Sequence, residues 1–133
     1  MAAAPSLLGG CLCGAVRYRI DAAPTAVMIC HCAICRRAAG APSVAWATIP
    51  AAGFAFTAGR PAEYASSPGV IRTHCAACGT SLTFRRDCGG EVDVTLASLD
   101  DPEALPPEYE GWLAHRLSWE AVDPARPGRD GGG

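Results

Sequence analysis

Seven of the eight cysteines in this 133-residue chain fall into three short groups. The groups are Cys11 and Cys13, then Cys30, Cys32 and Cys35, then Cys75 and Cys78. Residues two apart on a strand place their Cα atoms near the upper limit for an unstrained disulfide, which disfavours pairing within a C-x-C motif. Thiolate sulfur is a preferred ligand of zinc, and C-x-x-C spacing is typical of zinc sites. The pattern therefore predicts metal binding.

Glycines indicate which of these cysteines share a metal ion. Gly14 follows Cys13 and Gly79 follows Cys78, whereas the middle group has no such glycine. In a metal knuckle the chain turns tightly so that backbone N–H groups point at sulfur, and a residue without a Cβ is favoured there. We therefore expect the two glycine-closed pairs to form one structural Zn(II) site with four thiolates and no open position. Its ligands would be Cys11, Cys13, Cys75 and Cys78.

The remaining triad of Cys30, Cys32 and Cys35 is one ligand short of a tetrahedral site. A zinc ion with three protein ligands keeps a fourth position for water or a substrate atom, which is the arrangement of catalytic zinc sites. Arg36 and Arg37 follow the triad directly. Their positive charge, together with the N–H groups of a short helix that begins here, would favour the thiolate forms and attract an anionic thiol substrate.

Other polar residues near these motifs have simpler interpretations. His31 lies between two ligands, but on an extended segment it faces away from them, so we expect a surface or core histidine. We expect Cys88, in the turn RRDCGG, to be an unpaired thiol rather than a fourth ligand of the triad. Asp100 and Asp101 precede Pro102 and are better explained as turn and cap residues than as a general acid and base.

Short strands must position these side chains. Val16, Tyr18 and Ile20 alternate with polar residues, and further β-branched or aromatic runs end at Gly, Pro or Ser. The predicted strands are CGAVRYRI, SVAWATI, GFAFTAG, GVIRTH, TSLTFR and EVDVTLASL. Helical signals are confined to one or two turns in AICRRAAG, ended by Gly40 and Pro42, and a single turn in LDDPEAL. The pattern predicts a mainly β fold of short antiparallel strands with one or two helical turns.

Length and composition favour one domain over residues 1–124, followed by a Gly- and Pro-rich tail over residues 125–133 that we expect to be disordered. The net charge of −2 gives no indication of nucleic-acid or membrane-surface binding, and no apolar run is long enough to span a bilayer. The N-terminal segment lacks the charged start of a secretory signal, so we interpret the protein as cytoplasmic and, from its lysine-free composition, bacterial. A reducing cytosol favours metal or catalytic thiols over disulfides.

The order C-x-C, C-x-C-x-x-C, C-x-x-C resembles that of the glutathione-dependent formaldehyde-activating enzymes, among the Mss4-like and centromere protein V-like zinc proteins. The resemblance extends from GGCLCGAVRY through CHCAICRRAAGAPSVAWATIP, SSPGVIRTHCAACGTSL and SLDDPEALPP to RLSW. It implies a zinc-stabilised Mss4-like β-tent with a structural zinc at the glycine-closed cysteines and a second, more labile zinc at the triad. His74 and Ser81 stand where the family often has an aromatic residue and proline, so we expect differences in pocket shape and none in the metal sites.

The resemblance further implies a carbon–sulfur lyase that condenses formaldehyde with glutathione to S-hydroxymethylglutathione. Its expected partners are a small-molecule thiol and an aldehyde, with glutathione as co-substrate and neither nucleic acid nor membrane. Cys32 matches the position able to leave the metal and meet the glutathione sulfur. We therefore expect Cys30, Cys32 and Cys35 to be catalytic and Arg36 and Arg37 to bind the co-substrate. Two alternatives are a non-catalytic zinc- or thiol-binding interaction module and a thiol redox switch.

Overall fold

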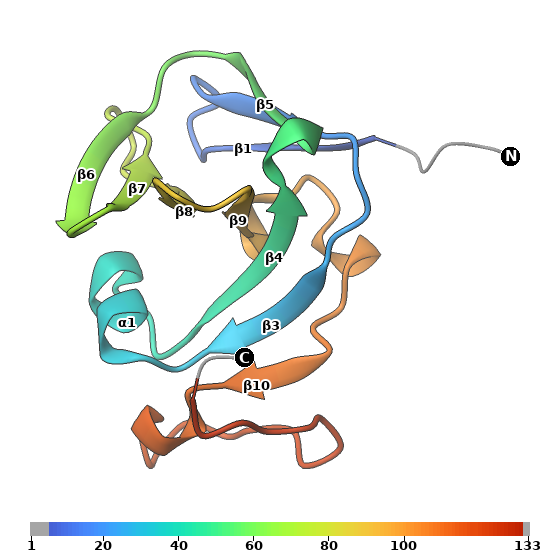
Figure 1. Ribbon diagram of the computed structural model, residues 1–133, viewed down its shortest axis with the longest axis vertical. Helices are drawn as coiled ribbons and strands as arrows, with labels where there is room; N and C mark the ends of the chain where they lie inside the picture. Colours follow the sequence, from blue (N-terminus) through green and yellow to red (C-terminus); the bar gives the residue numbers. More distant parts are fainter. Residues whose placement is uncertain (1–5, 132–133) are drawn as a thin grey trace, which may run out of the picture.

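The computed structural model describes residues 6–131, which form ten strands in two sheets (Figure 1). Residues 1–5 and 132–133, which include the start of the predicted domain and the end of the predicted tail, lie outside the described residues. The smaller sheet has the order β1-β2-β5 and the larger one the order β10-β3-β4-β9-β8-β7-β6. Within the described residues, no helix is long and apolar enough to cross a membrane.

The smaller sheet consists of β1 (Leu7–Gly10), β2 (Arg17–Ile20) and β5 (Phe54–Ala58). The larger sheet consists of β3 (Ala26–Cys30), β4 (Val44–Pro50), β6 (Ala62–Ser67), β7 (Val70–His74), β8 (Ser81–Arg86), β9 (Glu91–Thr95) and β10 (Tyr109–Gly111). Each of the six predicted strand segments overlaps one of these strands, with β4 and β8 running one residue further, and the mainly β prediction is confirmed. The antiparallel prediction has one exception, because β10 pairs with β3 in parallel.

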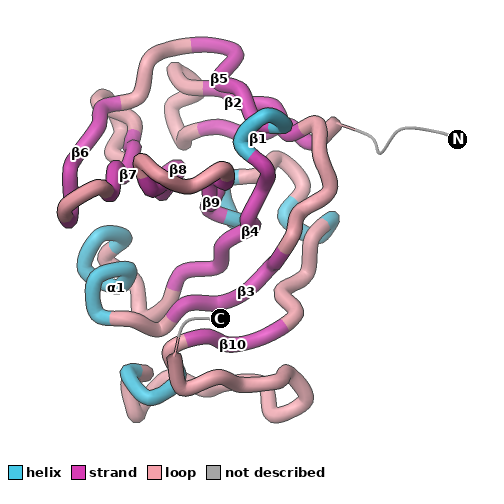
Figure 2. The backbone as a smooth tube through the Cα atoms, in the orientation of Figure 1, coloured by secondary structure: helices cyan, strands magenta, loops and turns pink. Residues whose placement is uncertain are grey.

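Helical structure is short, as Figure 2 shows. The α-helix α1 spans Ala33–Ala39, ends at Gly40 in the left-handed conformation, and lies in the predicted segment. Four 3₁₀ turns are η1 (Ala51–Gly53), η2 (Leu96–Ser98), η3 (Pro102–Ala104) and η4 (Leu113–His115). The turn η3 is the single turn predicted in LDDPEAL, with Asp101 before Pro102 at the first helical position.

The buried side chains form two clusters, and each contains one group of cysteines. The larger cluster lies between the two sheets, where Tyr18, Ile49 and Leu82 are fully buried, and it includes Cys11 and Cys75. The smaller cluster comprises Cys30, Cys35, Val44 and Trp46, with Met28, Cys32 and Phe84 packed against it. Most of these cysteines are therefore part of the packed interior of the protein, whereas Cys13 is exposed.

The described part of the C-terminal segment is ordered against β10, unlike the predicted disordered tail. Residues 126–131 run beside this strand (Figure 1), and Gly128 forms a parallel bridge with Glu110. The guanidinium of Arg129 lies 4.1 Å from the ring centroid of Tyr109. Composition predicted disorder because this segment is rich in Gly and Pro and carries no hydrophobic pattern. The structure instead holds it through backbone hydrogen bonds and arginine contacts, which need no apolar periodicity.

Candidate metal centres

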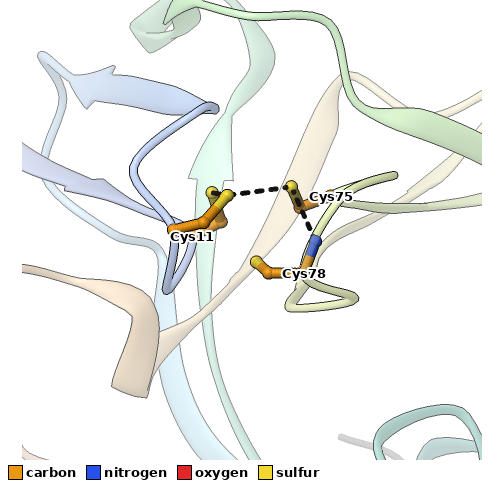
Figure 3. Close-up of side chains that lie close together, drawn as sticks. Cys11, Cys75 and Cys78 are labelled. Atoms are coloured by element: carbon orange, nitrogen blue, oxygen red, sulfur yellow. Dashed lines mark hydrogen bonds between the residues drawn. The ribbon is translucent and has the colours of Figure 1, made fainter.

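The first cysteine group joins two loops from different sheets. Cys11 and Cys13 lie between β1 and β2, and Cys75 and Cys78 lie between β7 and β8, with the two loops facing each other in Figure 3. All four sulfur atoms lie within 4.8 Å of one another. The Sγ atom of Cys13 is 3.6 Å from Cys11 Sγ and 3.7 Å from Cys75 Sγ. Tetrahedral zinc with Zn–S bonds of about 2.3 Å places its sulfur atoms about 3.8 Å apart. The donor set therefore fits a closed zinc site, which we call the four-cysteine cluster.

Both loops of the four-cysteine cluster have the predicted knuckle geometry. Gly14 and Gly79 have φ angles of 82° and 83°, which residues with a Cβ rarely adopt. The structure leaves open space around the Cβ that either glycine lacks, so the requirement comes from backbone conformation and not from crowding. The N–H groups of Val16 and Cys78 point at sulfur, at 3.3 Å from Cys11 Sγ and 3.5 Å from Cys75 Sγ.

The second group, Cys30, Cys32 and Cys35, forms a separate cluster whose three sulfur atoms also lie within 4.8 Å of one another. Cys30 ends β3, Cys32 is the N-cap of α1, and Cys35 lies in the first turn of this helix. The extended backbone of Cys32 turns its sulfur toward the helix, where it accepts a hydrogen bond from the Cys35 N–H at 3.3 Å. We call this group the three-cysteine cluster, and its donors fit a zinc ion with one position left for another ligand.

A cation from a distant strand contacts the three-cysteine cluster. Nη2 of Arg72, on β7, lies 3.7 Å from Cys35 Sγ. Two further contacts hold this side chain, because its Nε donates to Ser66 Oγ at 3.2 Å and its guanidinium lies 4.9 Å from the Phe84 ring centroid. No spacing in the sequence links Arg72 to Cys35, and the only local signal was that GVIRTH would form a strand.

Contacts within each cluster favour ionised sulfur at some of its cysteines and oppose it at others. A hydrogen bond from Cys30 lowers the pKa of the Cys35 thiol to about 5, and contacts with Cys32 and Arg72 act in the same direction. The same hydrogen bond raises the pKa of Cys30, because it stabilises that thiol in its protonated form. In the four-cysteine cluster, hydrogen bonds from Thr80 lower the pKa of Cys78 to about 5. Thiolates are the form in which cysteine binds metal.

A cavity of about 530 Å³ lies beside the three-cysteine cluster. Its lining includes Cys35, the cations Arg37 and Arg72, and the aromatic side chains of Trp46 and Tyr64. His74 and Ser81 also line the cavity. These are the two positions at which the sequence differs from the family pattern, so the differences affect the cavity lining. None of the lining residues in the described part of the chain is acidic. The volume is within the range of small-molecule sites, and the charge suits an anionic ligand.

The structure separates the two arginines that the sequence predicts as co-substrate ligands. Arg37 lines the cavity, whereas Arg36 is absent from its lining, and Arg36 Nε is buried without a hydrogen-bonding partner among the described residues. An α-helix turns by about 100° per residue, so neighbouring side chains on α1 point in different directions. The cavity instead takes its second arginine, Arg72, from β7.

The remaining candidates lie outside both clusters. His31 is buried but belongs to neither metal-binding group among the described residues, as expected for a core histidine. Cys88 is exposed in the turn between β8 and β9 and joins neither cluster. Asp100 forms an ion pair with Arg17, and Asp101 precedes η3, in agreement with structural roles for both.

Comparisons with known proteins agree with this architecture. The model of a family described as glutathione-dependent formaldehyde-activating enzyme matches residues 6–115. A crystal structure of a Rhodobacter sphaeroides protein, a structural genomics target, has a similar fold with a TM-score of 0.61. The two chains share 25% sequence identity, and the match covers 73% of this chain and 93% of the other. A search of the curated proteins found no match.

Proposed function

Because this chain belongs to the glutathione-dependent formaldehyde-activating enzyme family, we propose that it is a zinc-dependent carbon–sulfur lyase acting on a small aldehyde and glutathione or a similar thiol. The product would be of the S-hydroxymethylglutathione type. The thiol sulfur forms a bond to the carbonyl carbon, and the carbonyl oxygen becomes a hydroxyl that carries the proton given up by the thiol. No electrons are transferred to or from a third reactant.

The observation that carries this proposal is the position of the three-cysteine cluster beside a cationic cavity. A closed cluster of four sulfur atoms serves structure, whereas three sulfur atoms leave room for a substrate atom. The Cys35 side chain both belongs to the cluster and lines the cavity. A thiol bound in the cavity would therefore have access to the metal-binding sulfurs.

The side chains around the cavity supply orientation and charge. When bound at Cys30, Cys32 and Cys35, zinc would supply a Lewis acid and keep the cysteines ionised. Arg37 and Arg72 attract the carboxylates of an anionic thiol, and we assign these two residues the co-substrate-binding role that we predicted for Arg36 and Arg37.

Two further residues complete the proposed roles. His74 is the histidine of the cavity lining, and imidazole is the commonest general acid–base group, so we assign it the transfer of the thiol proton to the carbonyl oxygen. Cys32 is half-buried at the start of α1 and does not itself line the cavity, so we assign its contact with the bound thiol to the metal site that it shares with Cys35, which does line the cavity.

Exchange NMR at equilibrium tests the proposal, because formaldehyde and thiols interconvert reversibly with their adducts without an enzyme. The purified protein is expected to accelerate exchange between glutathione and its adduct, and Cys32→Ser is expected to reduce the rate to the background. The matched control is Cys88→Ser, which removes an exposed thiol outside both clusters and should exchange at the wild-type rate. Repeating the assay with other thiols and aldehydes identifies the substrate.

Two results would contradict this assignment. A wild-type protein that binds zinc without accelerating exchange for any thiol would be a zinc- or thiol-binding module. A Cys32→Ser variant as fast as wild type would place the reaction outside the three-cysteine cluster.

A further inference from the structure

A buried polar network lies behind the three-cysteine cluster and is not used in the proposed reaction. Its centre is His31, which is 1% exposed and stands between two of the cluster's cysteines. His31 Nε2 donates to Glu110 Oε1 at 2.7 Å, and the other oxygen of Glu110 accepts a hydrogen bond from Arg126. The carboxylate of Glu110, itself almost completely buried, is thus held between a ring nitrogen and a guanidinium.

A second carboxylate, that of Glu120, reaches both ends of the segment that carries α1. Its Oε1 accepts a hydrogen bond from Ser43 Oγ at 2.7 Å, just before β4. Its Oε2 lies 3.4 Å from His31 Nδ1, an ion-pair distance, and neither of these buried atoms has a hydrogen-bonding partner among the described residues. Residues 31 and 43 flank Cys32, Cys35 and the whole of α1. The Glu120 side chain therefore contacts residues at both ends of the segment 31–43.

Backbone hydrogen bonds place Glu110 against this segment. The His31 N–H donates to the carbonyl of Gly111 at 3.1 Å, which extends the pairing of β3 with β10. The C-terminal segment pairs in turn with Glu110, which donates to Pro127 and accepts from Arg129, both at 2.8 Å. Figure 1 shows this part of the chain along the side of β10 away from β3. Glu120 and Arg126 follow residue 115, where the family match ends.

We propose that Glu120 is a positioning residue for the three-cysteine cluster, acting through His31 and Ser43. Holding both ends of the segment restricts the arrangements of Cys32 and Cys35 before any ligand binds. Mutation of a residue that orients metal ligands without touching the metal typically lowers metal affinity about 10- to 100-fold. Glu110 and Arg126 fix His31 from the opposite side. The zinc measurement below rests on the proposed metal site, but no part of the inference rests on turnover.

Two measurements on the full-length protein test the proposal. The first is hydrogen–deuterium exchange, measured separately for residues 31–43 and for residues 75–80, which carry two ligands of the four-cysteine cluster. The second is the rate at which a chromophoric chelator removes zinc. Glu120→Ala should accelerate amide exchange in residues 31–43 and leave residues 75–80 unchanged. It should accelerate zinc removal from the three-cysteine cluster about 10- to 100-fold and leave the four-cysteine cluster as in wild type. Glu120→Gln, which keeps an oxygen for Ser43, should lie between Glu120→Ala and wild type.

Two further variants complete the design. Ser43→Ala removes the hydrogen bond from Ser43 to Glu120. Its effect should not add to that of Glu120→Ala, because both variants break this same hydrogen bond. Glu103→Ala makes the same chemical change at an exposed residue of η3 and should behave as wild type.

Unchanged amide exchange in residues 31–43 of Glu120→Ala would overturn the proposal, whether or not the wild-type cluster holds zinc. Equal acceleration at both clusters would also overturn it, because that result indicates a general loss of stability. Absence of turnover in the wild-type protein would contradict the proposed function alone.

Discussion

Arg72 combines three contacts that give a single side chain a defined direction. Its guanidinium lies over Phe84, its Nε donates to Ser66, and its Nη2 faces Cys35. A guanidinium held in this way loses little further freedom when it meets an anion, and its charge does not depend on pH in the physiological range. Arg72 therefore offers a fixed positive charge where the cavity meets the three-cysteine cluster.

We predict that Arg72→Ala lowers kcat/KM about tenfold for glutathione and changes it little for uncharged 2-mercaptoethanol, because only the anionic thiol gains from the charge. The measurement is exchange NMR with both thiols, and high salt should reduce the wild-type preference for glutathione. Arg85→Ala is the control, because Arg85 lies on the adjacent strand and pairs with Glu63 outside the cavity lining. Equal losses for the two thiols would show that Arg72 supports packing and not thiol recognition.

Local spacing predicted the cysteine groups, and it could not predict their polar neighbours. The residue types and the two glycines identify each set of donors, because ligands close in sequence meet through the short turns that they themselves form. Arg72 reaches Cys35 from 37 residues away in the chain. Glu110 reaches His31 from β10, and Glu120 reaches it from the loop after η4. Such contacts depend on strand order and register, which no local pattern fixes.

The pairing of β4 with β9 buries a carboxyl group in the larger sheet. Asp93 lies opposite Thr48, whose hydroxyl donates to the carboxyl at 2.5 Å. Burial raises the pKa of Asp93, because desolvation penalises the ionised form more than the hydrogen bond from Thr48 favours it. Ionisation of Asp93 at neutral pH therefore lowers the stability of the folded protein. The register of β4 and β9 buries this carboxyl and so determines the effect.

We predict that Asp93→Asn increases the free energy of unfolding at pH 7, since an amide keeps the acceptor for Thr48 without a charge. In the wild type, the raised pKa of Asp93 means that stability falls as pH rises from the unfolded value near 3.8 through the folded value. The advantage of the variant should therefore shrink toward pH 3.8. Urea unfolding across this range checks the prediction, with the exposed Asp87→Asn as control. A variant less stable than wild type at pH 7 would refute it.

The strands themselves were predictable where alternation or β-branched runs are long enough. Tyr18 and Ile20 are buried on the same side of β2, as their alternation predicts. The three-residue strand β10 carries no such pattern, because its sequence is Tyr-Glu-Gly and it is held by parallel pairing with β3. The C-terminal segment depends on β10 in turn, so its order could not be predicted from its own composition.

At the scale of the whole molecule, the two cysteine clusters have different places in the architecture. The four-cysteine cluster joins the loop β1–β2 of the smaller sheet to the loop β7–β8 of the larger one. A zinc ion there would fasten the two sheets, with an apparent binding free energy of about 10 kcal/mol or more that also stabilises the fold. The three-cysteine cluster involves the larger sheet alone, because its cysteines lie at the end of β3 and the start of α1, before β4. Its residue Cys35 lines the cavity.

The most direct test of this division is a titration of the cobalt-substituted protein with glutathione, followed by sulfur-to-cobalt charge-transfer absorption. The protein should bind two Co(II) ions per chain, one at each cluster. Added glutathione should increase the absorption to a plateau as a fourth sulfur joins the three-cysteine cluster, and Cys32→Ser should abolish this increase while the signal of the four-cysteine cluster remains. A spectrum that glutathione leaves unchanged, or an identical increase in Cys32→Ser, would contradict an open thiol-binding metal site at Cys30, Cys32 and Cys35.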